Sequence, residues 1–402
     1  MTSRQRILTT LKHKEPDQVP VDLGGMDSTG ITAVAYNRLK SYFGLKREKC
    51  KVYDPLQQIA IVEDKVLKRV KADVISLLLR PGGWKDKILS DGSLAQFPEK
   101  IEMKSLPDGS EVIFNEKREA FAKKPASGYY FEPVNPPLER CSTIGEVRSK
   151  LKVLENYDLP FYWDQSFEEL GKEARNLYEN SEYAIFGNFG VHLFAAGQLL
   201  RGFTNFMMDL IINPKLSDFI LGALCDFYIE RFKKYIKEVG TYIQIINVND
   251  DLGTQDALQI SPEIYRKKIK PYHKRLFQFI KKNSSTYLFL HSDGSIYEII
   301  PDLIEIGVDI LNPVQYTAKG MGTRKLKREF GKELSFWGGG CDTQKILPLA
   351  SPKEVREEVK RRIEDLAPGG GFVFCQVHNI QPDVPLENII AMYEAVEDYG
   401  KY

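Results

Sequence analysis

The chain has 402 residues, of which 43% are hydrophobic and 28% are charged, and its 56 Lys and Arg nearly balance its 55 Asp and Glu. These proportions are ordinary for a soluble globular protein of one or two domains. The near-zero net charge argues against a general nucleic-acid binder, and the lack of a long apolar run argues against a membrane span.

The cysteines and the N-terminus indicate the cellular compartment. The five cysteines are scattered, and no Cys-x-x-Cys pair occurs. The N-terminal residues Met1-Thr-Ser-Arg lack the apolar core of a signal peptide. We therefore expect a cytoplasmic protein with free thiols.

Short runs of β-branched and aromatic residues predict eight strands. In chain order they are Val19–Leu23, Asp73–Leu79, Tyr183–Gly187, Tyr242–Val248, Thr286–His291, Val308–Pro313, Leu334–Trp337 and Gly371–Phe374. From Tyr183 onward the strands alternate with helical segments, three of which have Pro at the first helical position, at Pro214, Pro262 and Pro352. This pattern predicts an α/β protein with a (β/α)8 TIM barrel, and an open doubly wound sheet is the alternative.

The segment from Trp84 to Glu139 departs from this alternation. It carries Asp91-Gly92 and Asp108-Gly109 between short mixed runs, a pattern typical of β-hairpins. We interpret residues 1–402 as a single domain in which residues 84–139 are a β-rich insertion after an early barrel strand. Such an insertion is a lid, an oligomer contact or decoration.

His291 and Asp293 lie two residues apart where a predicted strand ends. Alternation along a strand places residues i and i+2 on one face, so both side chains can reach one metal ion. A lone His-x-Asp pair is a weak signal, because an isolated His is more often hydrogen-bonded inside a loop. Asp293 is also a natural turn residue before a helix.

Two further strand ends carry candidate ligands. Cys341 follows Gly338-Gly-Gly, which permits a tight turn or the approach of a substrate. His378 stands in the loop after the last predicted strand, whereas Cys375 lies inside that strand and is expected to pack in the core. Because parallel barrel strands end at one mouth, His291, Asp293, Cys341 and His378 form our predicted metal site.

A fourth strand end, from Asn247 to Gln255, contains Asp250 and Asp251. Carboxylates at this position suit proton handling or the orientation of a metal-bound His, so Asp250, Asp251 and His291 are our catalytic candidates. Capping of the following helix explains the two aspartates equally well.

Four longer motifs resemble the uroporphyrinogen decarboxylase superfamily. They cover nearly the whole chain, least clearly between Trp84 and Glu139. The motifs are Arg6-Ile-Leu with His13-Lys-Glu-Pro16-Asp-Gln-Val-Pro20, Asp250-Asp-Leu-Gly-Thr-Gln255 with Ile260-Ser-Pro-Glu263, Ile304-Glu-Ile-Gly-Val-Asp-Ile-Leu-Asn-Pro-Val-Gln315, and Val377-His-Asn-Ile-Gln-Pro-Asp-Val-Pro385. The resemblance implies a (β/α)8 barrel, often dimeric, so we expect a homodimer.

The resemblance implies one of two chemistries. The decarboxylases remove acetate carboxyls from a tetrapyrrole without a metal, and they follow the early Val-Pro with an Arg-rich stretch. The methyltransferases move methyl groups to or from a cobalt corrinoid, with zinc held by a His-x-Cys and a distant Cys. Here no Arg occurs between Arg6 and Arg38. A polycarboxylate would lack guanidinium partners, apart from Arg80 or Arg201 for one carboxylate, so the methyltransferase branch is favoured.

The chain departs from the methyltransferase pattern in its ligands. Asp293 stands in place of the Cys, His378 in place of the distant Cys, and Cys341 is a plausible substitute ligand. A zinc site with two His and one Asp is harder than a thiolate site and suits an oxygen substrate rather than a thiol. We therefore expect zinc-assisted O-demethylation of a methoxylated, aromatic substrate.

In this hypothesis the cobalamin or other corrinoid is carried by a separate partner protein, whose cobalt accepts the methyl group. The substrate-binding candidates are Met26, Asp27, Asn188, His192, Gln198 and Trp337, although ordinary barrel core explains the aromatic residues as well. The alternatives are a decarboxylase, a methylcorrinoid:acceptor methyltransferase working in reverse, and a barrel that only binds a corrinoid or its carrier.

Overall fold

The structure is a computed structural model that describes residues 1–45, 49–152, 154 and 161–402. Its α-helices are α1 (Ser3–Thr10), α2 (Ala33–Tyr42), α3 (Asp64–Arg69), α4 (Ile144–Ser149), α6 (Phe167–Asn180), α7 (Phe194–Arg201), α8 (Phe203–Ile212), α9 (Pro214–Val239), α10 (Pro262–Ile264), α11 (Lys270–Asn283), α12 (Ile300–Glu305), α13 (Thr323–Phe330), α14 (Ile346–Leu349), α15 (Pro352–Leu366) and α16 (Leu386–Tyr399). Among the described residues no helix combines the length and the apolar character needed to cross a membrane.

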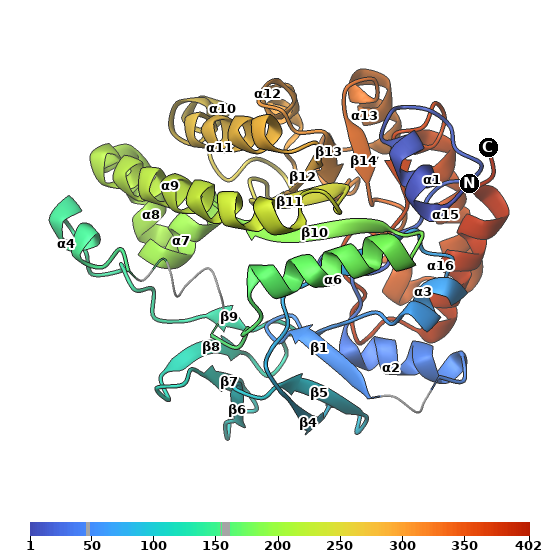
Figure 1. The fold of residues 1–402 in the computed structure, drawn as a ribbon, viewed down its shortest axis with the longest axis horizontal. Coiled ribbons are helices and arrows are strands. Elements are labelled where there is room, and N and C mark those ends of the chain that lie inside the picture. The colour runs from blue at the N-terminus through green and yellow to red at the C-terminus, as the bar shows by residue number, and fades with distance from the viewer. Residues whose placement is uncertain (46–48, 153, 155–160) are drawn as a thin grey trace.

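The strands form one parallel sheet and two smaller sheets (Figure 1). The parallel sheet has seven strands in the order β15-β14-β13-β12-β11-β10-β3. Its members are β3 (Val74–Leu77), β10 (Ala184–Val191), β11 (Ile245–Asn249), β12 (Tyr287–His291), β13 (Ile310–Asn312), β14 (Ser335–Trp337) and β15 (Phe372–Val373).

Seven of the eight predicted strands are strands of this sheet, with ends shifted by a few residues. Their order along the sheet follows their order in the chain, so there is no switch point, and the doubly wound alternative is wrong. The first predicted strand, Val19–Leu23, makes only an isolated parallel bridge from Val21 to Phe374. Because the amide of Asp73 also donates to the carbonyl of Val21 at 2.7 Å, this segment lies between the two edges of the curved sheet.

The strands are apolar because both faces of the sheet are covered. On the inner face, Phe186, Phe289 and Trp337 are fully buried and pack edge to face, with ring centroids 5.0 to 5.9 Å apart. On the outer face, the helices of the βα units cover the sheet, and the capping box at Ser351 starts α15 as its sequence predicts. The inner aromatic cluster fills the centre of the sheet, so a ligand must bind at the strand ends.

Residues 50–133 also form the two smaller sheets, which lie together on one side of the parallel sheet in Figure 1. One has the order β2-β1-β5-β4, and the other β6-β7-β8-β9, with antiparallel pairing of β4 with β5 and of β6 through β9. Their strands are β1 (Cys50–Asp54), β2 (Ile59–Ala60), β4 (Trp84–Ile88), β5 (Leu94–Pro98), β6 (Glu102–Ser105), β7 (Glu111–Phe114), β8 (Ala120–Lys124) and β9 (Glu132–Pro133). A small core of Ile101, Ile113, Ala122, Phe131 and Tyr162 supports the second of them.

The buried pair of Trp337 and Asp22 gives a stability prediction. The indole Nε1 donates to Asp22 Oδ2 at 2.9 Å, and burial raises the pKa of Asp22 to about 6 despite the hydrogen bonds that it accepts. A carboxyl with a raised folded pKa stabilises the fold below its unfolded pKa, and that contribution is lost as the pH rises through about 6.

Trp337→Phe removes a donor that matters most to the ionised carboxylate. At pH 8 we expect the variant to lower the free energy of unfolding by about 2 kcal/mol beyond the effect of volume loss. At pH 5 this additional decrease should be about 1 kcal/mol. Urea unfolding at both pH values measures this difference. Trp84→Phe, at a partly exposed position in β4, is the control and should show no pH dependence. Equal losses at the two pH values would contradict the assignment.

Candidate metal centre

Polar residues occupy the carboxyl ends of three neighbouring strands. Asn249 ends β11, His291 ends β12 and Asn312 ends β13, and in the sheet Asn249 is paired with His291 and His291 with Asn312. The preceding residues of these strands are almost all buried and apolar. Parallel register therefore places these three polar side chains in one row at the mouth.

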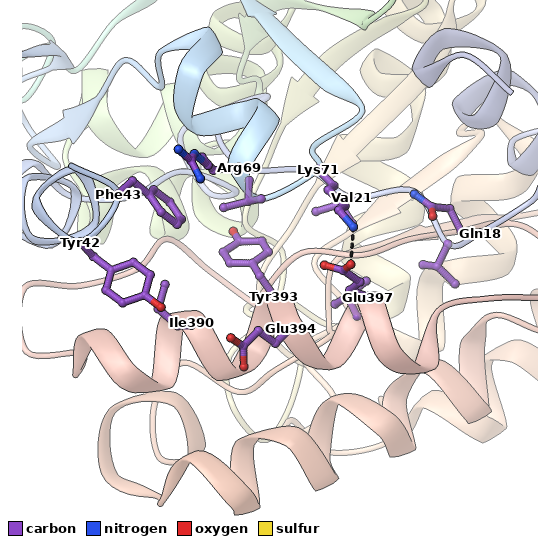
Figure 2. Close-up of a pocket in the computed structure, with 13 residues that line it drawn as sticks. Gln18, Val21, Tyr42, Phe43, Arg69, Lys71, Ile390, Tyr393, Glu394 and Glu397 are labelled. Carbon is purple, nitrogen blue, oxygen red and sulfur yellow. Dashed lines mark hydrogen bonds and ion pairs between the residues drawn. The ribbon is translucent and has the colours of Figure 1, made fainter. Parts of the chain in front are cut away.

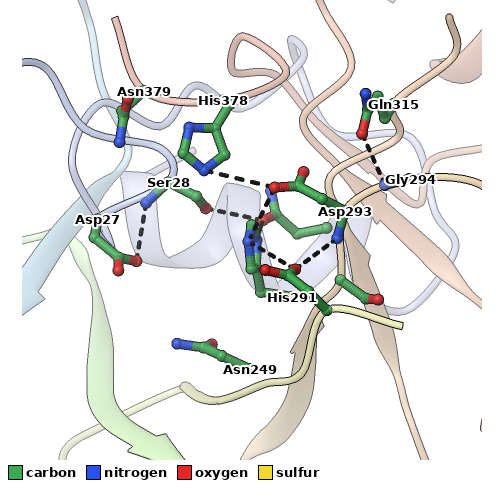
Figure 3. Close-up of polar contacts among 12 residues, drawn as sticks. Asp27, Ser28, Asn249, His291, Asp293, Gly294, Gln315, His378 and Asn379 are labelled. Carbon is green, nitrogen blue, oxygen red and sulfur yellow. Dashed lines mark hydrogen bonds and ion pairs between the residues drawn. The ribbon is translucent and has the colours of Figure 1, made fainter. Parts of the chain in front are cut away.

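His291, Asp293 and His378 converge at this mouth (Figure 3). Asp293 Oδ2 lies 3.7 Å from Nε2 of His291 and 3.7 Å from Nε2 of His378. One ligand atom from each residue lies within 4.8 Å of the other two. The structure thus brings together three of the four metal ligands that the sequence predicts.

Asn312 fixes the orientation of the His291 ring. Nδ1 of His291 lies 2.7 Å from Asn312 Oδ1, and Asn312 Nδ2 donates to the backbone carbonyl of Trp337 at 2.9 Å. The second bond identifies Oδ1 as the acceptor, so Nδ1 of His291 carries the proton. The lone pair of Nε2 therefore points toward Asp293, as a metal ligand requires.

The charges around His291 are mostly negative. Burial lowers the pKa of His291, but Asp293, Asp251 and Asp27 raise it, and the net pKa lies above its ordinary value. Only 8% of His291 is exposed, whereas the side chains of Asp293 and Asp251 are 33% and 51% exposed, so solvent partly screens their charges. The site is built to favour a positive charge.

The loop that carries Asp293 is held by several hydrogen bonds. Asp251 Oδ1 accepts from the amide of Asp293 at 3.0 Å, and Gln315 Oε1 accepts from the amide of Gly294 at 2.7 Å. Gly294 has a φ of 88° and packs against the backbone of Gly253, where a Cβ would clash. This glycine permits the close approach of two loops and so fixes the carboxylate of Asp293 next to the histidines.

The donor set fits zinc. Two imidazole nitrogens and one carboxylate oxygen are common zinc ligands, and a tetrahedral site with bonds of about 2.0 Å needs donor separations of roughly 3.3 Å. The two separations from Asp293, 3.7 Å each, are slightly larger, and all three ligand atoms lie within 4.8 Å of one another, so the side chains would have to move closer together to bind one ion. Asp251 Oδ1, 3.8 Å from His291 Nε2, is close enough to serve as a further ligand or as an acid beside the metal.

Asp250 does not face this site. It is buried, its oxygens accept from the amides of Leu193, Phe194 and Ala195, and His273 Nε2 lies 2.8 Å from Oδ2. Burial raises its pKa, but these bonds prevail and the net pKa lies below the ordinary value. Asp250 therefore anchors the start of α7, a helix that precedes it in the chain, rather than the following helix or the candidate site.

Cys341 lies apart from the group as well. After β14 the chain turns through Gly338 and Gly339, whose φ angles are 84° and 79°. The thiol is fully buried next to charged groups of α15, including Glu358, and burial raises its pKa well above the ordinary value. A thiol held in this way is a poor source of thiolate, so Cys341 is better described as core packing than as a metal ligand.

The predicted substrate residues fall into two groups. Met26 and Trp337 are fully buried in the inner core, so they form the floor beneath the mouth and are not open to a substrate. The other four are half-buried: Asp27, Asn188, His192 and Gln198. Asp27 lies beside the histidines in Figure 3.

Two of these half-buried residues are already hydrogen-bonded. Asn188 Nδ2 donates to the carbonyl of Gly25 and to Ser76 Oγ, and Gln198 Nε2 donates to Gln259 Oε1 at 2.9 Å. These hydrogen bonds fix the orientation of both side-chain amides, so a substrate would contact amides that are already oriented.

The two arginines considered for a substrate carboxylate are engaged elsewhere. Arg201 is 8% exposed and pairs with Asp209 at 2.8 Å, and Arg80 pairs with Glu173 at 3.2 Å. The carboxylates nearest to His291 would also repel an anionic substrate. The mouth therefore suits a neutral substrate better than a polycarboxylate.

Sequence reasoning missed Asn312 and Tyr130. Asn312 ends a predicted strand, so the strand-end rule that found His291 would also have found it. Tyr130 lies between β8 and β9, outside the parallel sheet, yet its hydroxyl lies 3.4 Å from Nδ1 of His378. No local signal marks this contact, which joins residues 248 positions apart.

A cavity of about 220 Å³ lies elsewhere, between α2, α3 and α16 (Figure 2). Its lining includes Phe43, Arg69, Ile390 and Tyr393, together with the ion pair of Lys71 and Glu397. It contains none of the predicted site residues, so the candidate chemistry stays at the mouth.

Comparison with known families agrees with the geometry. Residues 146–399, more than half of the chain, match the model of the family described as "Uroporphyrinogen decarboxylase (URO-D)". The chain belongs to the uroporphyrinogen decarboxylase family. The matched region includes β10 to β15 and all three converging residues.

Individual relatives are more distant. A uroporphyrinogen decarboxylase of Geobacter metallireducens is 30% identical over 180 residues, which is 44% of this chain and 48% of the relative. One of Thermus thermophilus is 26% identical over 145 residues, 35% of this chain and 38% of the relative. The chain thus matches about half, or less, of the length of these relatives.

A solved structure of a "methyltransferase from Methanosarcina mazei" superposes with a TM-score of 0.60 and covers 99% of both chains at 17% identity. At this level of identity the likeness concerns the fold.

Zinc binding can be tested on the isolated protein. We expect about one equivalent of zinc to bind, and His291→Ala or His378→Ala to weaken binding by at least about a hundredfold, because each removes a direct ligand. Cys341→Ala is the matched control and should bind zinc like the unaltered protein. Competition with a chromophoric chelator measures the affinities. Loss of zinc in Cys341→Ala but not in His378→Ala would reverse the assignment.

Proposed function

We propose that this chain, a single-domain (β/α)8 barrel with a hairpin insertion at residues 84–139, is a corrinoid-dependent methyltransferase. It would transfer a methyl group from a methoxylated aromatic substrate to the cobalt of a corrinoid that a partner protein carries. The observation that supports this proposal is the donor set of His291, Asp293 and His378, with no thiolate among the three. Hard nitrogen and oxygen ligands favour an oxygen substrate.

The chain's own residues supply position and charge. His291, Asp293 and His378 would hold zinc, which supplies a Lewis acid for the ether oxygen when bound. Asp251, whose side chain is half exposed and lies 3.8 Å from Nε2 of His291, would assist the departure of the leaving oxygen. Asp27 and Asn188 offer polar contacts at the rim, and the buried floor of Met26 and Trp337 keeps water from below.

The reaction balances without an external oxidant. The electron pair of Co(I) forms the new cobalt–carbon bond, the methyl carbon–oxygen bond breaks, and its pair stays on oxygen. The phenolate then takes a proton. The protein's share is alignment of donor and acceptor and stabilisation of the charge on oxygen.

A decarboxylase acting on a tetrapyrrole is the second candidate, because the curated relatives carry that name. Two observations weigh against it. Carboxylates surround His291, and Arg80 and Arg201 are paired with Glu173 and Asp209. A substrate with several carboxylates would be repelled at the mouth.

A methyl-transfer assay separates the two functions. The protein, a reduced corrinoid carrier and 2-methoxyphenol should give methylcobalt, visible in the absorption spectrum, together with catechol. His291→Ala and His378→Ala should lower kcat/KM by about 10²–10³-fold, the cost of losing stabilisation of a developing oxyanion. Cys341→Ala should retain activity.

Carbon dioxide released from uroporphyrinogen, without methyl transfer, would establish the decarboxylase instead. Methyl transfer seen only from methylcobalt to an acceptor would establish the reverse direction. The protein would be a non-catalytic binding protein if neither it nor any variant transferred methyl groups and His291→Ala still bound the corrinoid carrier normally.

We also propose a homodimer. Support comes from α8, which exposes Phe203 at 59%, Ile211 at 66% and Ile212 at 69%. A row of exposed apolar side chains is typical of a protein interface. Ile211→Glu should shift the dimer toward monomer in light scattering, whereas Leu349→Glu, at an exposed position on α14, should not. A monomer at all concentrations of the unaltered protein would refute the proposal.

A further inference from the structure

The segment between β8 and β9 delivers Tyr130 to the metal centre. The neighbouring Phe131 is buried in the small core, with 3% exposure, and its amide donates to the carbonyl of Leu56 at 2.9 Å. Gln58 Nε2 donates to the carbonyl of Tyr129 at 3.2 Å. The backbone on both sides of Tyr130 is therefore anchored, and the phenol ring stands edge-on to the ring of His378 with centroids 6.3 Å apart.

A chain of hydrogen bonds runs from Asp27 to Tyr130. Gln57 Nε2 donates to Asp27 Oδ2 at 3.1 Å, Asn379 Nδ2 donates to Gln57 Oε1 at 2.8 Å, and the Tyr130 hydroxyl donates to Asn379 Oδ1 at 2.9 Å. Each link is set by the one before it. A carboxylate oxygen accepts, so it must meet the NH₂ of Gln57, and each amide then presents its oxygen to the next donor.

In this series of hydrogen bonds, the Tyr130 oxygen can only accept from its other neighbours. The hydroxyl donates its single proton to Asn379 Oδ1, and Gln381 Nε2 donates to the hydroxyl oxygen at 2.6 Å. The remaining neighbour is Nδ1 of His378 at 3.4 Å, a long hydrogen bond in which the histidine must donate. The proton of His378 then lies on Nδ1, and Nε2 carries the lone pair that faces Asp293.

We propose that Tyr130 is a positioning residue that sets the tautomer and ring orientation of His378 for metal binding, through the ordered chain Asp27–Gln57–Asn379–Tyr130. Asn312 does the same for His291 by a separate route. Both histidines thus present Nε2 to Asp293. Asn312 in the parallel sheet orients His291, and Tyr130 between β8 and β9 orients His378. This inference deepens the zinc site of the proposed function and needs no methyl transfer for its test.

The tautomer is measured directly in the metal-free protein. The chain has only five histidines, so long-range ¹H–¹⁵N spectra at alkaline pH can resolve them, with His378→Gln identifying the signal of His378. We expect the proton of His378 on Nδ1. In Tyr130→Phe it should move toward Nε2, and zinc affinity should fall by about 10–100-fold, the usual cost of losing a partner of a metal-binding histidine.

Two further variants sharpen the test. Tyr129→Phe is the matched control, since Tyr129 is adjacent but 43% exposed, and both readouts should stay as in the unaltered protein. Gln57→Leu breaks the chain two links away and should shift the His378 tautomer in the same direction as Tyr130→Phe. If Tyr130→Phe unfolds the segment between β8 and β9, Gln57→Leu still provides the test.

A proton on Nε2 of His378 in the unaltered protein would overturn the inference. So would zinc affinity in Tyr130→Phe equal to that of Tyr129→Phe. If the unaltered protein bound no zinc, the proposed metal centre would fail while the tautomer measurement would still decide the role of Tyr130. If zinc bound but no methyl transfer occurred, the inference on Tyr130 would stand and the proposed reaction would fail.

Discussion

The hydrogen bond between His291 and Asn312 is the constraint on which the candidate metal centre depends. It joins the last residues of two neighbouring parallel strands, so its geometry follows from the register of the sheet. Asn312 is itself oriented by the carbonyl of Trp337, at the end of the next strand. The backbone of three strands thereby decides which nitrogen of His291 faces the mouth, before any metal arrives. A preset ligand costs little entropy on binding.

Much of this arrangement is visible in the sequence, because parallel strands buried on both faces are short apolar runs. Polar residues that end such runs must lie at the mouth, and this rule brought His291, Asp293 and His378 together correctly. The same rule failed for Asp250 and Cys341. Its weakness is that a strand end fixes where a residue lies but not which way its side chain turns.

The direction is decided by contacts that sequence spacing does not encode. Asp250 turns outward because three amides at the start of α7 and the ring of His273 bind its oxygens. Cys341 turns toward α15 because two glycines with positive φ redirect the chain. Tyr130 was missed for the same reason, since its contact with His378 joins the connection between β8 and β9 to the loop after β15. Packing between distant segments, rather than local propensity, completes the site.

The carboxylates around His291 make this place favourable for a positive charge. Asp27, Asp251 and Asp293 all raise the pKa of His291, which shows that the cluster favours positive charge despite burial. A zinc ion at this site would need the neutral ring, so metal and proton would compete for Nε2 and zinc affinity would fall as the pH falls. A zinc ion would bring two positive charges to the site, whereas a proton on the ring would bring one. A zinc ion would therefore reduce the repulsion among the three carboxylates more than a proton would. Its binding would stabilise the folded protein.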